Sequence, residues 1–308
     1  MEIDVELGEI YMSVIFIFID GVGLGEESSE NPFYTDRYKS FEILTNGLFN
    51  LNAISKVENG RLFKPIDANL GVEGLPQSGT GQTTLFTGRN AAKEIGKHFG
   101  PFPHTGIKPF LKKESVFHAA LEKDKKPYFL NAYPPVFFEH AKKRNRWSCT
   151  TLMTKSSGLK LNSTEDVLNE TALTAEIIQN AWRDKLGIDI PKITPTDAAK
   201  RLLDVVPEYD LLLYEYYLTD KAGHSQKNED AQRVLKPLDE FLLHIINNMK
   251  SSDTLVITSD HGNLEDLSTK THTRNKVPLF VLGSNVHQFE NVESLTDVKD
   301  GIMNAIIQ

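Results

Sequence analysis

Short apolar runs rich in β-branched residues end at acidic or histidine side chains in separate parts of the chain. The run Val14–Ile19 ends at Asp20, and Thr254–Thr258 leads through one serine into Asp260 and His261. Continuous runs of this length are typical of parallel strands that are buried on both faces. Because the carboxyl ends of parallel strands meet at one edge of an open α/β sheet, we expect these side chains to gather there.

Strand and helix patterns alternate along most of the chain. The apolar runs at residues 209–216 and 277–282 predict further strands. Residues 171–185 and 234–249 carry apolar side chains at helical spacing and predict helices. This alternation predicts an α/β fold with a central, mostly parallel sheet and helices on both faces.

Residues 134–195 fit the alternation poorly. They are rich in Lys, Ser, Asn and Thr and include a basic run at 142–146. We predict that this segment leaves the sheet as a small cap or an extended loop with one helix. Residues 1–133 and 196–308 would then form the α/β core that carries the candidate site. The basic run is either a solvated surface or a rim that attracts an anionic substrate.

Composition and charge argue against several classes of protein. The chain has 308 residues and a formal net charge of −8, so it lacks the basic footprint of a nucleic-acid-binding protein. Its longest apolar run, at residues 14–19, is far shorter than the roughly 20 residues of a membrane span. The acidic start at residues 1–6 does not resemble a secretory signal. With the single cysteine, Cys149, these features predict a cytoplasmic protein.

Three carboxylates and three imidazoles are expected to converge at the sheet edge. They are Asp20, Asp220, His224, Asp260, His261 and His272. The spacing of Asp220 and His224 places both on one side of a helix. Carboxylates gathered in one cleft repel one another and resist desolvation unless cations bind them. The sequence therefore predicts a centre with two divalent ions, and the mixed oxygen and nitrogen ligands suit Zn²⁺ or Mn²⁺.

A turn rich in glycine and hydroxyl side chains, at residues 77–84, leads into a predicted helix. Its simplest interpretation is an N-cap with turn glycines, because Ser and Thr are favoured there. Alternatively, one hydroxyl is a nucleophile at a helix N-terminus, where the helix dipole and free N–H groups stabilise a phosphate. Such a hydroxyl needs a base or a metal to remove its proton, and the predicted metal centre would supply this activation.

The order of these motifs resembles the alkaline phosphatase superfamily of metalloenzymes. It is most similar to the phosphatase-type domain of cofactor-independent phosphoglycerate mutase and to phosphopentomutase. The matching segments are Phe18-Ile19-Asp20-Gly21, Gly74-Leu75-Pro76-Gln77-Ser78, Asp220-Lys-Ala-Gly-His224, Thr258-Ser259-Asp260-His261-Gly262-Asn263 and Thr271-His272-Thr273. The resemblance implies an alkaline phosphatase-like fold. It also implies two ion sites, with Asp220, His224 and His272 as ligands of one ion, and Asp20, Ser78, Asp260 and His261 as ligands of the other.

The resemblance further implies that Ser78 is the nucleophile. In the family this residue lies three positions before a glycine and ten before a Gly-Arg pair, as Ser78 does relative to Gly81 and Gly88-Arg89. The chain also departs from the mutase pattern. Gly79 and Gln82 stand where the mutase has a glutamate and a histidine.

The large second domain of the mutase, which supplies the arginines that hold its sugar acid, is absent. Only a loop at residues 93–109 occupies its place. We therefore expect hydrolysis of a small phosphate ester through a phosphoserine intermediate, because a mutase must shield that intermediate from water. An intramolecular phosphomutase and a non-catalytic metal-binding module are the alternatives. Candidate substrate contacts are Arg89, His98, Lys108 and Arg146.

Overall fold

The computed structural model describes residues 12–307, so the acidic start at residues 1–6 lies outside the described residues. A seven-stranded sheet has the order β2-β3-β7-β6-β1-β5-β4. The strands are β1 (Val14–Ile19), β2 (Lys56–Glu58), β3 (Arg61–Ile66), β4 (Pro127–Phe129), β5 (Leu211–Tyr216), β6 (Thr254–Thr258) and β7 (Val277–Gly283).

The central strands of the sheet are parallel. β1 pairs in parallel with β5 on one side and with β6 on the other, and β4 continues this arrangement beside β5. β7 is antiparallel to β6 and to β3, and β2 is antiparallel to β3. The predicted α/β fold with a mostly parallel central sheet is confirmed for β4, β5, β1 and β6, and the antiparallel strands β7, β3 and β2 make the whole sheet mixed.

Helices connect the strands. In chain order they are α1 (Pro32–Thr35), α2 (Lys39–Thr45), α3 (Ser78–Thr87), α4 (Ala91–Ile95), α5 (Lys108–Lys113), α6 (Val116–Leu121), α7 (Pro135–Arg144), α8 (Cys149–Ser156), α9 (Thr164–Leu168), α10 (Asn180–Asp184), α11 (Pro195–Val205), α12 (Leu218–Ser225), α13 (Asn228–Asn248) and α14 (Leu295–Ile307). Within residues 12–307, none of them combines the length and the apolar character that crossing a bilayer requires.

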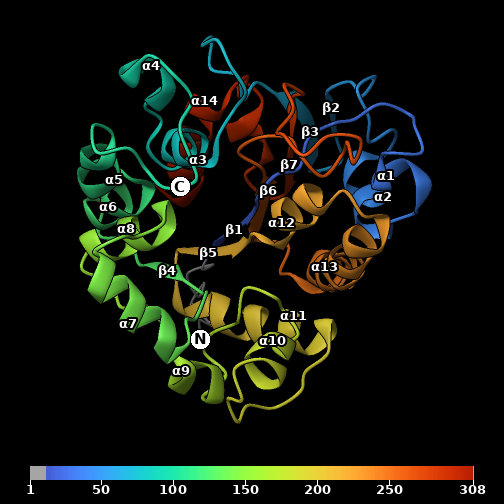
Figure 1. The fold of residues 1–308 in the computed structure, drawn as a ribbon. Helices are drawn as coiled ribbons and strands as arrows, with labels where there is room; N and C mark the ends of the chain where they lie inside the picture. Colours follow the sequence, from blue (N-terminus) through green and yellow to red (C-terminus); the bar gives the residue numbers. More distant parts are fainter. Residues whose placement is uncertain (1–11, 308) are drawn as a thin grey trace, which may run out of the picture.

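Both faces of the sheet are covered by helices (Figure 1). One apolar cluster joins Phe16 and Phe18 of β1 to α3, α5, α6, α8 and α14. A second cluster joins Ile15 and Ile17 of the same strand to α2, α11, α12 and α13. Because successive side chains of a strand point to opposite faces, β1 is buried on both sides, as its apolar run predicts.

The helix predicted over residues 171–185 is wrong in its first half, since only Asn180–Asp184 is helical. The backbone of Leu173 is extended and pairs with the segment that follows β4: its N–H donates to the carbonyl of Leu130 and its carbonyl accepts from the N–H of Ala132. These bonds continue the sheet, and tertiary pairing of this kind overrides helical periodicity. The expectation of one helix in residues 134–195 is also wrong, because α7, α8, α9 and α10 lie there.

Candidate metal centre

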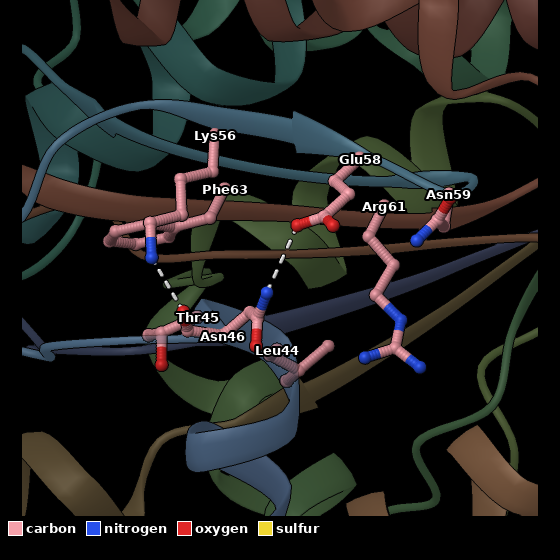
Figure 2. A pocket seen from close by; sticks show the side chains of 8 residues that line it. All are labelled: Leu44, Thr45, Asn46, Lys56, Glu58, Asn59, Arg61 and Phe63. Carbon is pink, nitrogen blue, oxygen red and sulfur yellow. Dashed lines mark hydrogen bonds between the residues drawn. The ribbon is translucent and has the colours of Figure 1, made fainter.

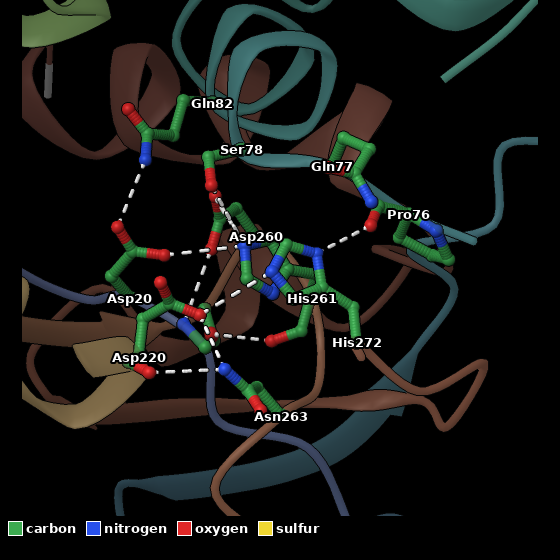
Figure 3. Close-up of polar contacts among 12 residues, drawn as sticks. Asp20, Pro76, Gln77, Ser78, Gln82, Asp220, Asp260, His261, Asn263 and His272 are labelled. Carbon is green, nitrogen blue, oxygen red and sulfur yellow. Dashed lines mark hydrogen bonds and ion pairs between the residues drawn. The ribbon is translucent and has the colours of Figure 1, made fainter. Parts of the chain in front are cut away.

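The candidate ligands follow the carboxyl ends of three neighbouring strands, and Figure 3 shows most of them gathered beside Ser78. Asp20 directly follows β1, and Asp260 and His261 lie just after β6. Asp220 and His224 are on α12, which begins two residues after β5, and His272 lies in the loop between β6 and β7. Since β5, β1 and β6 are adjacent and parallel, residues far apart in the sequence meet at one edge of the sheet.

One group of ligand atoms surrounds the ring of His261. Its Nε2 lies 3.3 Å from Oδ1 of Asp20 and 3.6 Å from Oδ2 of Asp260. The Oγ of Ser78 lies 3.0 Å from the same nitrogen. Ser78 is the first residue of α3, and all four side chains are buried. The structure thus places the predicted nucleophile and the predicted ligands of one ion around a single point.

Asp220, His224 and His272 form the second group. The Nε2 of His224 lies 3.3 Å from Oδ2 of Asp220, and the Nε2 of His272 lies 3.5 Å from Oδ1. The two ring nitrogens are 3.3 Å apart. Each Nδ1–H donates to a backbone carbonyl, at 2.7 Å to Lys270 and at 2.7 Å to Pro76. These hydrogen bonds from Nδ1 orient both rings so that their Nε2 atoms face the carboxylate of Asp220, as in metal-binding histidines.

Protonation equilibria in both groups show a shortage of positive charge. Burial and the charge of Asp260 raise the pKa of Asp20 well above its usual range, and burial likewise raises the pKa of Asp260. Burial disfavours a charged His261 ring, yet Asp260 and Asp20 outweigh it and raise its pKa to about 10. The hydrogen bond with Asp220 raises the pKa of His224. Each group therefore attracts a proton to the place that a bound cation would take.

The donor atoms fit divalent ions. Oδ1 of Asp20 and Oδ2 of Asp260 are buried and accept no hydrogen bond from any described residue, although buried carboxylate oxygens are normally satisfied. Burial and the neighbouring His261 ring lower the pKa of His272 to about 4, so its Nε2 carries a free lone pair at neutral pH. Carboxylate oxygen and imidazole nitrogen suit Zn²⁺ and Mn²⁺, and each group offers three such ligands.

Two polar side chains to which the sequence analysis assigned no role, Gln82 and Asn263, hold candidate ligands in place. Gln82, where the mutase pattern has histidine, donates from Nε2 to Oδ2 of Asp20 at 3.2 Å. Asn263 donates from Nδ2 to Oδ1 of Asp220 at 2.7 Å. Asn263 is part of the Asp-His-Gly-Asn motif, so its position immediately after the ligand pair is the signal that could have identified it.

Glu215 is a buried acid close to the first group that the sequence analysis missed. It lies in β5 beside Phe18 of β1, and its Oε2 accepts a hydrogen bond from Thr150 at 2.7 Å. Burial, reinforced by the charge of Asp20, raises the pKa of Glu215 to about 7. A single acid within the apolar run of β5 is the signal that would have found it, because buried strands rarely carry charge.

None of the four candidate substrate contacts makes a hydrogen bond or an ion pair with a candidate ligand among residues 12–307. The Nε of Arg89 pairs with Glu114 at 3.7 Å. His98 lies against the carbonyl of Val72, and Lys108 begins α5. The guanidinium of Arg146 stacks 4.0 Å above the ring of Phe102. A substrate-binding role for these four residues stays a prediction.

The loop between α4 and α5, at residues 96–107, explains why a glycine follows the predicted nucleophile. A Cβ atom at Gly79 would lie 2.4 Å from the carbonyl oxygen of Phe102 and 2.6 Å from that of Phe99. The backbone of Phe99 also exchanges two hydrogen bonds with Thr80, at 2.9 Å and 3.2 Å. The loop therefore packs directly on the first turn of α3 and leaves no room for the glutamate of the mutase pattern.

Replacing Gly79 by alanine is expected to destabilise the protein by about 2 kcal/mol, because backbone atoms cannot move aside as a flexible side chain can. Turnover should fall as well, since Ser78 is the preceding residue. Denaturant unfolding and initial rates measure the two effects. Gly106→Ala in the same loop is the matched control, because its Cβ would meet only ordinary contacts at 3.4 Å. Equal stability of the two variants would contradict the packing argument.

A surface hollow of about 250 Å³ between α2, β2 and β3 lies apart from this centre. Figure 2 shows its lining side chains, none of which is a candidate ligand. Asn46 bridges the hollow by donating to Glu58 at 3.1 Å and by accepting from Lys56 through its carbonyl. These contacts pair Asn46, Lys56 and Glu58 with one another across the hollow.

Comparison with known proteins agrees with the geometry. Residues 176–307 match the Metalloenzyme superfamily, and this part of the chain contains five of the six acidic and histidine candidate ligands. The 2,3-bisphosphoglycerate-independent phosphoglycerate mutase of Clostridium botulinum (strain ATCC 19397 / Type A) is 30% identical over 138 residues, which cover 39% of this chain and 27% of that protein. The phosphopentomutase of Kosmotoga olearia is 35% identical over 95 residues, covering 30% and 24% respectively. The chain thus spans about a quarter of the length of the curated relatives it matches.

Solved structures share the fold over almost the whole chain. The PH0037 protein from Pyrococcus horikoshii superposes with a TM-score of 0.59 at 13% identity, covering 96% of this chain and 97% of that chain. The alkaline phosphatase from the Antarctic bacterium TAB5 gives a TM-score of 0.55 at 13% identity, covering 96% and 98%. The predicted alkaline phosphatase-like fold is confirmed.

Proposed function

We propose that the protein catalyses metal-dependent phosphoryl transfer through a phosphoserine at Ser78. The match of residues 176–307 to the Metalloenzyme superfamily and the alkaline phosphatase-like fold support this proposal. The net reaction is hydrolysis of a small phosphate ester. One observation carries the proposal: the Oγ of Ser78 lies 3.0 Å from Nε2 of His261, beside two buried carboxylates. A hydroxyl in that position is adjacent to the atoms that would hold a cation.

The residues of the chain divide the work. Asp220, His224 and His272 would hold one divalent ion, and Asp20, Asp260 and His261, with Ser78, would hold the other. When bound, the ions supply the positive charge that stabilises a phosphate and its attacking and leaving oxygens. The 3.0 Å separation of Ser78 Oγ from Nε2 of His261 places the hydroxyl and this ligand nitrogen at the same point. The first turn of α3 adds the positive end of its helix dipole beside the same hydroxyl.

Solvent access favours hydrolysis over phosphate return to the substrate. The side chains of His224 and Asp220 are 44% and 19% exposed, so water reaches this group of ligands. A mutase must protect its phosphoenzyme from water. An intramolecular phosphomutase is the second candidate, because curated relatives that match this chain are a phosphoglycerate mutase and a phosphopentomutase. A cytoplasmic location, without nucleic-acid or membrane partners, stays part of the proposal and is supported by the composition.

The proposal predicts release of free phosphate from phosphomonoesters in the presence of Mn²⁺ or Zn²⁺. The test is a substrate panel, including p-nitrophenyl phosphate and sugar phosphates, assayed in ¹⁸O-labelled water. We expect one labelled oxygen in each phosphate released. Isomerised phosphate esters without free phosphate would instead support the phosphomutase. Metal binding without turnover across the panel would support a non-catalytic metal-binding module.

A further inference from the structure

A buried carboxylate beside the metal centre belongs to neither group of ligands. Glu265 lies in the loop between β6 and β7 and is 1% exposed. Within residues 12–307 it makes no ion pair with a Lys, Arg or His side chain. A buried carboxylate is costly unless hydrogen bonds satisfy it, so its contacts indicate what it does.

Three segments donate hydrogen bonds to Glu265: one in the loop that follows β1 and two in the β6–β7 loop itself. Its Oε2 accepts from the backbone N–H of Gly23 at 2.8 Å and from that of Asn263 at 2.7 Å. Its Oε1 accepts from the hydroxyl of Thr273 and from Nδ2 of Asn275, the latter at 3.1 Å. Both oxygens are thus used twice, which an ionised carboxylate can do because it only accepts hydrogen bonds.

Each of these three segments also carries a candidate metal ligand. Gly23 lies three residues after Asp20, Asn263 lies two residues after His261, and Thr273 follows His272 directly. The side chain of Asn263 reaches further and donates to Asp220 (Figure 3). Through direct contacts and this one relay, Glu265 is connected to ligands of both groups.

The backbone at Gly23 and Gly262 packs directly against the carboxylate of Glu265. A Cβ atom at Gly23 would lie 2.4 Å from Oε1 of Glu265, and one at Gly262 would lie 2.2 Å from the same oxygen. Glycine at both positions lets the backbone reach the carboxylate. A smaller or neutral side chain at position 265 would leave buried N–H groups without acceptors, which is unfavourable.

We propose that Glu265 is a positioning residue that couples the two ion sites by fixing the loop after β1 and two segments of the β6–β7 loop to one another. This inference rests on the metal centre of the proposed function. Side chains that support metal ligands without touching the ion commonly change metal affinity by about 10–100-fold when they are replaced. Because Glu265 holds together segments that carry ligands of both groups, its replacement is expected to weaken both ion sites together.

The test is calorimetric titration of the full chain with Mn²⁺ and, separately, with Zn²⁺. We expect Glu265→Ala to raise both dissociation constants by about tenfold or more. Glu265→Gln, which keeps the volume and one acceptor oxygen, should show a smaller increase at both sites. It also carries the test where the alanine variant does not fold. Asn285→Ala is the control: its buried amide donates to the carbonyl of Ala305 beyond the opposite end of β7, so stability should fall while metal affinity stays unchanged.

The outcomes separate this inference from the proposed function. Two sites in the wild-type protein, with unchanged dissociation constants in both Glu265 variants, would overturn the coupling role but leave the metal centre intact. Weakening of only one site would overturn it too, as would equal weakening in Asn285→Ala. A wild-type protein that binds neither ion would overturn the metal centre itself, and the coupling role with it.

Discussion

The variant Ser78→Ala is expected to lose metal-dependent phosphoester turnover by at least about a thousandfold, since removal of a catalytic nucleophile has effects of this size or larger. No neighbouring hydroxyl can replace it. Thr83 and Thr84 donate to helix carbonyls at 2.6 Å and 2.8 Å, and Thr80 donates to the carbonyl of Gln77 at 3.1 Å. Only Ser78 in this turn directs its hydroxyl toward His261.

Two measurements check this result. Steady-state rates with a chromogenic phosphate ester give the loss of turnover, and mass spectrometry of acid-quenched enzyme should find phosphoserine at Ser78 in the wild-type protein alone. Thr83→Ala is the matched control, because it removes a hydroxyl from the same helix; we expect lower stability with kcat within about threefold of the wild type. Undiminished metal-dependent turnover in Ser78→Ala would show that the nucleophile assignment is wrong.

Removing divalent ions is expected to abolish turnover and to lower the melting temperature. Asp20 and Asp260 are 7% and 0% exposed, and each has an oxygen that no described residue satisfies. An ion present at a hundred times its dissociation constant would stabilise the fold by about 2.7 kcal/mol, which corresponds to a shift of about 4 °C for each site in a chain of this size. Thermal unfolding before and after chelation, and after Mn²⁺ or Zn²⁺ is restored, measures the shift.

The ion-dependent shift should be larger at pH 8 than at pH 5, because protons compete with the ions for imidazole and carboxylate ligands. In Asp260→Asn we expect the chelator-sensitive shift to shrink, since one ligand of the Ser78 group is replaced. Asp230→Asn changes charge equally in an exposed pair with Arg233 on α13 and should keep the full shift. An identical response of both variants to chelation would argue against ion binding by Asp260.

The local sequence pattern was sufficient to predict the parallel centre of the sheet and the candidate ligands that follow its strands. A strand buried on both faces requires a continuous apolar run, so β1, β5 and β6 can be predicted from the sequence. Their ligands follow at once or on the next helix. The pair Asp220 and His224 is one helical turn apart and needs only local helix geometry to face one side.

Contacts between distant segments were beyond the reach of local pattern. Leu173 lies in a segment with helical spacing, yet it pairs with the edge of the sheet beyond β4. Glu215 is an acid inside an apolar strand, and its neighbour Thr150 comes from α8, far away in the chain. Periodicity records only which face of an element is apolar, and it carries no information on which remote group will be adjacent.

By itself, the sequence determined which strands end at the sheet edge that carries the candidate ligands, and which acids and histidines follow them. Both features depend only on neighbours along the chain. The resemblance to a known family already pointed to Ser78, but only the tertiary structure showed that its hydroxyl meets the ring of His261 and that Gly79 packs against the loop between α4 and α5. It also showed that Glu265 joins the loop after β1 to two segments of the β6–β7 loop. Each of these depends on backbone atoms brought together from distant segments, and their distances exist only in the folded chain.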